Sequence, residues 1–171
     1  MENKFYVVLD NIRSRENVGA IFRTADAAGV SKIFLCGITP APPHEKISKT
    51  ALGAEKWVPW EYHKQTWRLL RQIKQNTLYS AIADYKVFSI IALEQTKKSV
   101  NIFKLKIPKN CSIVLVVGNE IKGLSPKILN YCDGIVSIPM FGKKESLNVS
   151  VAAGIAVYAI LQIFGLTESI K

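Results

Sequence analysis

The chain contains few of the residues that bind metals or form disulfide bridges. Only three cysteines and two histidines occur among its 171 residues. The cysteines form no C-x-x-C pair and neither histidine is near one, so no zinc-ligand spacing can be assembled. An odd number of widely separated cysteines indicates reduced thiols in a cytosolic setting. We therefore predict a cytoplasmic protein that holds no metal.

Long hydrophobic runs are also missing. Residues 5–9 and residues 151–161 are apolar, but both runs are too short to cross a bilayer. The first run is also too short for a signal peptide. The sequence therefore predicts a soluble protein with no membrane partner, and it favours a buried helix at residues 151–161.

Acidic residues are scarce relative to basic ones. The chain has 23 lysines and arginines against 13 aspartates and glutamates, which gives a net charge of +10. This excess favours a polyanionic partner such as nucleic acid, although charge does not separate RNA from DNA. With 49% apolar residues the chain can bury a substantial core, so we expect one domain over residues 1–171.

Continuous apolar runs alternate with helical patterns along the chain. We predict strands at residues 5–9, 32–36, 78–83, 87–93, 112–117 and 135–138, and helices at 17–28, 48–56, 65–75, 126–131 and 147–164. The fold class is therefore α/β, with a largely parallel sheet flanked by helices. Ligands bind at the carboxyl ends of such strands, which points to the segments after Cys36, Val117 and Ile138.

A glycine-bearing segment, VLVVGNEIKGLS at residues 114–125, follows one of these strands. A phosphate-binding loop would need a lysine where Leu124 stands, and the G-x-G-x-x-G fingerprint of dinucleotide sites is absent. A plain strand-to-helix turn, with glycines at positive φ, is the simplest interpretation of this segment taken alone. A nucleotide-dependent enzyme that uses Gly118 to Ser125 is a further alternative.

Two other segments change this interpretation. NVGAIFRTADAAGV at residues 17–30 contains Arg23, and IPMFGKKESLNVSVAAG at residues 138–154 runs from a predicted strand into a predicted helix. Together with VVGNEIKG, these segments resemble, in order, the three motifs of the SpoU/TrmH family of RNA ribose 2′-O-methyltransferases, part of the SPOUT class. The three motifs span nearly the whole chain.

The resemblance implies a SPOUT α/β-knot, with a deep trefoil knot near the C-terminus, and S-adenosyl-L-methionine as the cofactor. It also implies a homodimer whose active site uses residues of both subunits, and a Gly118 that leaves room for the adenosyl group. The implied activity is methyl transfer to a ribose 2′-hydroxyl of structured RNA, with tRNA favoured and rRNA next. A knotted RNA-binding protein without catalytic activity is the alternative. No separate substrate-binding domain is expected, which leaves the target nucleotide open.

The resemblance assigns catalytic roles to five polar residues. Arg23 would promote proton loss from the 2′-hydroxyl, although a guanidinium, which stays protonated at neutral pH, is a poor base. Asn17 is also suited to cap the first predicted helix, and a glutamate such as Glu120 is favourable at any helix start. The five residues are Arg23, Asn17, Glu120, Ser146 and Asn148, of which the last two are also capping candidates.

Other residues are assigned to the cofactor and to RNA. The resemblance places the cofactor against Leu93, Gly118, Ile138, Met140 and Leu147, although an aliphatic residue such as Leu93 is usually just part of a core. Six basic residues near the motifs are predicted to contact RNA phosphates: Arg13, Arg15, Lys46, Lys49, Lys143 and Lys144. One helix face is predicted to carry Lys64, Arg68, Arg71 and Lys74, and it either binds RNA or is simply solvated.

Overall fold

A seven-stranded parallel sheet forms the centre of the molecule in the computed structural model, which describes residues 4–75, 88–107 and 111–163. The strand order is β3-β2-β1-β6-β4-β7-β5, and all six neighbouring pairs are parallel. The bounds are β1 (Phe5–Asp10), β2 (Lys32–Cys36), β3 (Trp60–His63), β4 (Phe88–Leu93), β5 (Val100–Asn101), β6 (Ser112–Val117) and β7 (Gly134–Ser137). The predicted parallel α/β sheet is confirmed.

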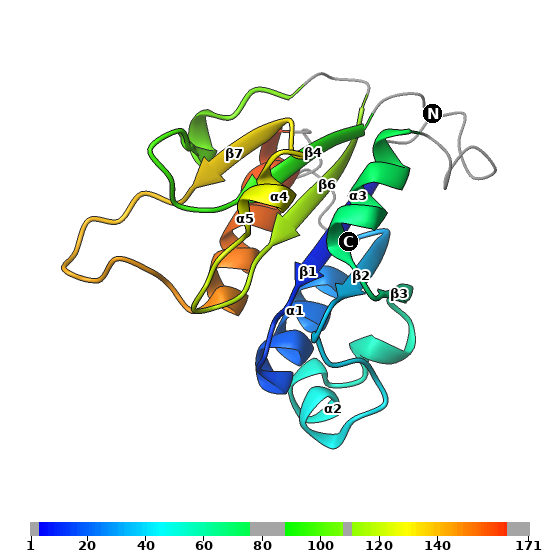
Figure 1. The fold of residues 1–171 in the computed structure, drawn as a ribbon. Helices are drawn as coiled ribbons and strands as arrows, with labels where there is room; N and C mark the ends of the chain where they lie inside the picture. Colours follow the sequence, from blue (N-terminus) through cyan, green and yellow to red (C-terminus); the bar gives the residue numbers. More distant parts are fainter. Residues whose placement is uncertain (1–3, 76–87, 108–110, 164–171) are drawn as a thin grey trace.

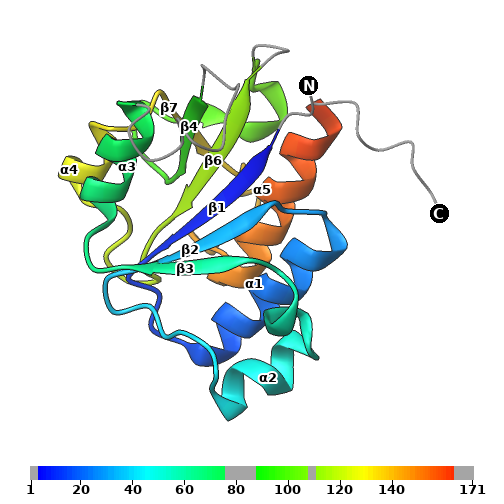
Figure 2. The same cartoon turned by 90° about the vertical axis from the view of Figure 1, so that its right-hand side faces the viewer.

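Helices cover both faces of this sheet. One face carries α1 (Arg15–Ala27), α2 (Glu45–Ala51) and α5 (Val149–Ile163), and the opposite face carries α3 (Thr66–Lys74) and α4 (Pro126–Leu129) (Figure 1; Figure 2). Short 3-10 helices occur at Ala54–Lys56 (η1) and Ile102–Lys104 (η2). Each face has its own cluster of buried apolar side chains. None of the helices in the described ranges is long and apolar enough to cross a membrane.

The central strands are apolar because both of their faces are covered. Every residue of β1 and β6 is buried, which explains why neither sequence alternates with polar residues. The register pairs Val117 at the end of β6 with Leu9 of β1 on one side and with Leu93 of β4 on the other. Three neighbouring strands therefore end at the same level, and the loops that follow them leave from one edge of the sheet.

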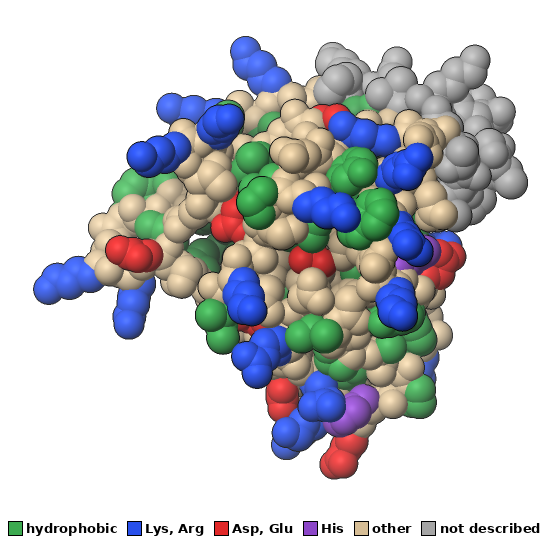
Figure 3. All heavy atoms as spheres, in the orientation of Figure 1, with side chains coloured by type: hydrophobic (Ala, Val, Ile, Leu, Met, Phe, Trp, Pro, Cys, Tyr) green, Lys and Arg blue, Asp and Glu red, His purple; other side chains and the backbone are tan. Residues whose placement is uncertain are grey.

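Basic side chains gather on the face of the molecule that carries α3 and α4. Figure 3 views this face and shows lysine and arginine side chains over α3 and beside α4. The side chains of α3 divide as predicted: Leu69, Leu70 and Ile73 are buried, whereas Arg68 and Arg71 are exposed. This face is therefore a candidate surface for a polyanion.

Several predicted boundaries were wrong. The helix predicted at residues 48–56 is broken at Leu52 and Gly53, whose φ angles of 52° and 98° are left-handed, so α2 and η1 are separate. The first helix begins at Arg15 rather than at Asn17, and its N-cap is Ser14, whose hydroxyl accepts a hydrogen bond from the Asn17 N–H (3.1 Å). The strands β3 and β5 were not predicted, and the strand predicted at residues 78–83 lies outside the described residues.

The contact between α1 and α2 depends on a glycine. A Cβ atom added at Gly19 would overlap the Thr50 hydroxyl oxygen and the Ile47 carbonyl oxygen, so no larger residue fits while the two helices stay in place. The Thr50 hydroxyl also donates to the Glu16 carbonyl (3.0 Å), which ties α2 to the first turn of α1.

We predict that Gly19→Ala lowers the free energy of unfolding by about 1–3 kcal/mol or more, because the added methyl group has backbone on one side of it. Gly154→Ala is the matched control in α5, since its Cβ would lie 3.7 Å from Thr24 Cγ2, an ordinary contact. The control should be neutral or stabilising by up to about 1 kcal/mol, the difference in helix propensity. Urea denaturation of both variants measures this, and equal stabilities would contradict the proposed close packing.

Candidate functional site

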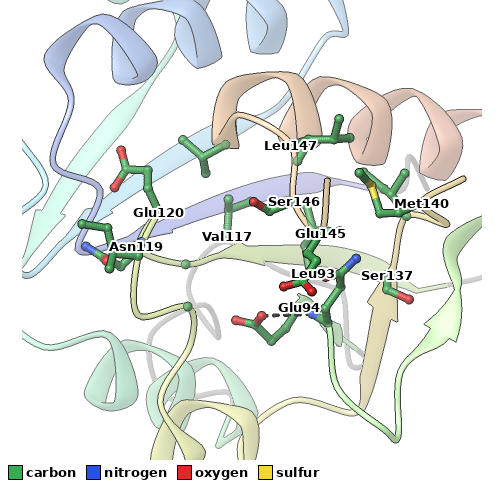
Figure 4. A pocket seen from close by; sticks show the side chains of 17 residues that line it. Leu93, Glu94, Val117, Asn119, Glu120, Ser137, Met140, Glu145, Ser146 and Leu147 are labelled. Atoms are coloured by element: carbon green, nitrogen blue, oxygen red, sulfur yellow. Dashed lines mark hydrogen bonds between the residues drawn. The ribbon is translucent and has the colours of Figure 1, made fainter. Parts of the chain in front are cut away.

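Three loops that follow neighbouring strands meet beside the start of α5. They follow β4, β6 and β7, which are adjacent in the sheet. A cavity of about 380 Å³ lies between them (Figure 4). Three strand ends, Leu93, Val117 and Ser137, line it. The rest of its lining comprises Glu94 and Gln95 of the first loop, residues 118–121 and Gly123 of the second, Ile138, Met140 and residues 145–147 of the third, and Val149 and Ala152 of α5.

All five residues that the sequence assigned to the cofactor line this one cavity: Leu93, Gly118, Ile138, Met140 and Leu147. Glu120 and Ser146, two of the predicted catalytic residues, line it as well. Aliphatic and polar side chains contribute to its walls in about equal measure. A cavity of this size and lining is typical of a site for an organic ligand.

Gly118 has a different structural role from the one expected. A Cβ atom at this position would lie 2.7 Å from Leu124 Cγ and 2.9 Å from the Gly123 carbonyl carbon. The room that the glycine leaves is therefore filled by the returning part of its own loop. Gly118 lines the cavity, but its missing side chain allows the loop to fold back and does not open space for a ligand on that side.

Glu94 fixes this folded-back loop, and sequence reasoning did not identify it. Its carboxylate accepts hydrogen bonds from the backbone N–H groups of Leu124 (2.6 Å) and Gln95 (2.9 Å). Gly123 has a φ of 61°, and a Cβ there would overlap the same carboxylate. Because this carboxylate already accepts from the Leu124 N–H, and would repel a phosphate beside it, the alternative of a nucleotide-phosphate loop at Gly118 to Ser125 is not supported.

Side-chain hydrogen bonds connect all three motif segments. Glu120 accepts from the Asn17 side chain (3.2 Å) and from the backbone N–H groups of Arg13 (3.2 Å) and Ser14 (3.3 Å). Asn148 in turn donates to the Asn17 side-chain oxygen (3.1 Å) and accepts from the Ser150 N–H (2.9 Å). Asn17 therefore links the other two motifs and does not cap α1, whereas Asn148 does bind the first turn of α5.

The Glu120 carboxyl is held in its ionised form. Partial burial raises its pKa, but hydrogen bonds from its own backbone N–H, Arg13, Asn17 and Ser14 outweigh this effect and hold the pKa below its usual value of 4.5. A carboxylate that accepts several N–H bonds is favoured over its protonated form, which could accept fewer. The site therefore presents a negative charge at the edge of the cavity at neutral pH.

Arg23 does not reach this cavity from its own chain. It is exposed on α1 and is not among the residues that line the cavity. Six residues separate it from Asn17, which corresponds to about 9 Å along the helix axis. Its neighbour Thr24 faces Gly154 of α5, so Arg23 lies near the junction of α1 and α5.

The six residues predicted to contact RNA are all exposed: Arg13, Arg15, Lys46, Lys49, Lys143 and Lys144. Lys46 lies 3.5 Å from Glu16 in an exposed ion pair, and Lys143 and Lys144 lie on the third loop, next to a Phe141 that is 95% exposed. Sequence reasoning missed Phe141, and it also missed Asn119, whose side chain donates to the Asn11 carbonyl (2.7 Å).

Across residues 4–75, 88–107 and 111–163, no group of three or more potential metal ligands is found.

Comparisons with known proteins give a consistent picture. The model of the SpoU rRNA Methylase family matches residues 4–158. The tRNA (guanosine(18)-2′-O)-methyltransferase of Aquifex aeolicus is 37% identical over 153 residues, which cover 89% of this chain and 66% of that protein. The 23S rRNA (guanosine-2′-O-)-methyltransferase RlmB of Neisseria meningitidis is 34% identical over 156 residues, or 91% and 57% of the two chains. This chain thus spans 57–66% of the length of these two relatives.

Solved structures share the fold. A TrmH/SpoU tRNA modifying enzyme of A. aeolicus superimposes with a TM-score of 0.80 at 32% identity, over 96% of this chain and 77% of that one. An AdoMet-bound rRNA methyltransferase of Sinorhizobium meliloti gives 0.81 at 28% identity, over 95% and 57%.

We predict that Glu120→Gln lowers stability at pH 7 and does so less at pH 3. Because the pKa of the folded protein is lowered, the carboxylate stabilises the fold above its usual value of 4.5, and this contribution is lost as the pH falls through the lower folded value. For so exposed a group we expect at most about 1 kcal/mol. Urea denaturation at both pH values tests this, with Glu145→Gln as a control that alters no hydrogen bond to the described residues. An equal loss at both pH values would contradict the proposed cause.

Proposed function

Since the chain belongs to the SpoU rRNA Methylase family, we propose that it transfers a methyl group from S-adenosyl-L-methionine to a ribose 2′-hydroxyl of structured RNA. The observation that carries this proposal is the convergence of all five predicted cofactor residues on one cavity of about 380 Å³. The substrate would be tRNA first and rRNA second, since relatives are named for both. An RNA substrate and an exposed basic surface are also consistent with a location in the cytoplasm.

The cavity suits the proposed cofactor. Leu93, Val117, Ile138 and Met140 provide aliphatic walls for a planar base, and the ends of β4, β6 and β7 bring backbone polar groups to its edge. Glu94 and Glu145 place carboxylates in the lining, which is favourable for a positively charged ligand. When bound, S-adenosyl-L-methionine would supply an electrophilic methyl group.

The hydrogen-bonded set of Glu120, Asn17 and Asn148 would position the ribose. Its members come from the three motifs, and Glu120 itself lines the cavity, so a sugar held there would lie beside the methyl group. Ser146, at the same edge, would add a further hydroxyl. In the reaction the 2′-oxygen would gain a bond to the methyl carbon as the carbon–sulfur bond breaks and the demethylated cofactor leaves. The 2′-hydroxyl proton would pass to solvent, and the Arg23 guanidinium would promote this loss by stabilising the negative charge that develops on the oxygen.

Arg23 would come from a second copy of the chain. It is exposed and absent from the cavity of its own protomer, so the site of a single chain lacks its guanidinium. The outer face of α5 is apolar and open: Val151 and Tyr158 are each 50% exposed, and Ile163 is 36% exposed. A helix buried on all sides would not expose these apolar side chains to solvent. A two-fold homodimer that covers it would explain both observations, because α5 packs beside α1.

A deep trefoil knot is also part of the proposal. The second and third loops and α5 would form it, since these segments belong to the matched family region and enclose the cavity. The basic residues Arg13, Arg15, Lys46, Lys49, Lys143 and Lys144 are proposed to contact RNA phosphates around the site, where they are exposed.

We predict that the purified protein methylates RNA. Incubation with labelled S-adenosyl-L-methionine and total RNA should transfer label to tRNA or rRNA, and the labelled position should resist alkaline cleavage because the 2′-hydroxyl is blocked. Cofactor binding in calorimetry without any label in RNA would instead favour the alternative of an RNA-binding protein without activity. Magnesium-dependent ATP binding would favour the nucleotide-dependent alternative.

We predict that two inactive variants restore activity when mixed. Arg23→Ala should abolish methyl transfer but leave cofactor affinity unchanged, and Met140→Trp should fill the cavity and abolish cofactor binding. If the site is shared, unfolding and refolding an equal mixture should give about a quarter of wild-type activity, because half of the dimers are mixed and each has one intact site. Sedimentation of each variant verifies the dimer.

If Arg23 instead acted within its own chain, every site in the mixed dimers would carry one defect and no activity would return. Full activity of Arg23→Ala alone would remove this residue from the mechanism.

A further inference from the structure

A second cavity lies on the opposite face of the sheet, away from the proposed cofactor. It has a volume of about 210 Å³ and lies at the carboxyl ends of β1 and β2, beneath the first residues of α3 and α4. The segment after Cys36, one of the three strand ends at which the sequence predicted a ligand, contributes Gly37 to this cavity. No residue assigned to the cofactor or to catalysis lines it.

The inner part of the second cavity is rich in hydrogen-bond acceptors. Asp10 is only 3% exposed, and its Oδ1 atom accepts from the Asn11 side chain (3.0 Å) and from the Thr66 hydroxyl. Burial raises the pKa of Asp10, although the bonds from Thr66 and then Asn11 oppose this rise. Gln65 also lines the cavity, and its Oε1 atom is buried without a donor among the described residues. Such acceptors favour a ligand with N–H groups.

The rim of the same cavity is cationic. Lys127 lies over the Trp67 ring, with 3.7 Å between its Nζ atom and the ring centroid, and this contact holds the ammonium in place. Within the described part of the chain, neither Lys127 nor Lys64 forms an ion pair, whereas Lys74 pairs with Asp133 at 2.9 Å. These two lysines therefore remain available to an anion at the rim of the cavity.

We propose that the second cavity binds one unpaired nucleotide of the RNA, with its base inside and its phosphate at Lys64 and Lys127. The inference rests on the proposed function, because it takes RNA as the substrate. A cavity of 210 Å³ has room for a single heterocycle and is far larger than an ion needs. Guanine fits best, since its Watson–Crick edge carries adjacent ring N–H and amino donors for acceptors such as the Gln65 Oε1 atom, unpartnered among the described residues, whereas uracil offers one N–H.

Two loops connect this cavity to the proposed reaction site. Asn11 lines the second cavity, and its carbonyl accepts a hydrogen bond from Asn119, which lines the first (2.7 Å). The segment from Gly118 to Ile128 contributes lining residues to both cavities, the first half to one and the second half to the other. A nucleotide in the second cavity would therefore contact the same loops that hold Glu120, and would help to select and orient the RNA.

The first test measures nucleotide binding without methyl transfer. Guanosine 5′-monophosphate is titrated into the full chain and followed by NMR, with uridine 5′-monophosphate and inorganic phosphate as comparison probes. We expect the guanosine probe to bind more tightly than the other two, and Lys64→Ala/Lys127→Ala to weaken it about tenfold. The control Lys104→Ala/Lys106→Ala removes the same charge from exposed positions elsewhere and should leave binding unchanged.

The second test measures catalysis. In Lys64→Ala/Lys127→Ala the KM for RNA should rise about tenfold while kcat and the affinity for S-adenosyl-L-methionine stay the same, and the salt dependence of RNA binding should flatten by about two phosphate contacts. A general loss of basic charge would affect the control variant equally.

The outcomes separate this proposal from the function on which it rests. An RNA KM and a nucleotide affinity that match those of the control would overturn the nucleotide site while methyl transfer by the wild type stands. Equal binding of phosphate and guanosine monophosphate would overturn the role of the base. If the wild type methylates no RNA, the proposed function fails, and selective nucleotide binding that depends on Lys64 and Lys127 would still support the cavity.

Discussion

The parallel register of β1, β6 and β4 is the constraint on which the rest of the structure depends. Because Leu9, Val117 and Leu93 are aligned across the three strands, the chain turns into three loops at one level of the sheet. Residues more than a hundred positions apart in sequence, such as Asn17 after β1 and Glu120 after β6, can then share a hydrogen bond. Burial of every residue of β1 and β6 holds this register in place, because slipping a strand would leave backbone groups unpaired between covered faces.

A competition between burial and hydrogen bonding governs the polar part of the site. Removing a carboxylate from water is unfavourable, and Glu94 and Glu120 are acceptable there because backbone N–H groups surround them. Glu94 thereby holds the loop after β6 from the neighbouring strand end, and Glu120, which belongs to that loop, ties it to the segment after β1. Glycines at 118 and 123 are required for this arrangement, since a side chain at either position would collide with Leu124 or with Glu94. The loop is consequently defined by contacts with the protein before any ligand binds.

Sequence patterns predicted the strands and helices whose apolar residues form long or periodic runs, and the segments that match a motif. The apolar runs of β1, β2, β4, β6 and β7 and the amphipathic α1 and α3 were found within a few residues, and the five residues predicted to hold the cofactor line one cavity. Periodicity could not find β3 and β5, because four-residue and two-residue edge strands carry too little pattern. Glu94 and the pairing of Trp67 with Lys127 depend on chain folding over 30 and 60 positions, for which local sequence holds no information.

The fixed position of helix α1 limits how its sequence can vary. Val18, Ile21, Phe22 and Ala25 anchor it against the sheet, and Gly19 locks it to α2, so it can neither slide nor turn. The positions of Asn17, near its start, and of Arg23, six residues later, are thus fixed relative to each other. Inserting a single residue between them would swing the guanidinium around the axis by about 100° while leaving composition and charge almost untouched. Natural variation in this segment should therefore proceed by substitution and not by changes of length.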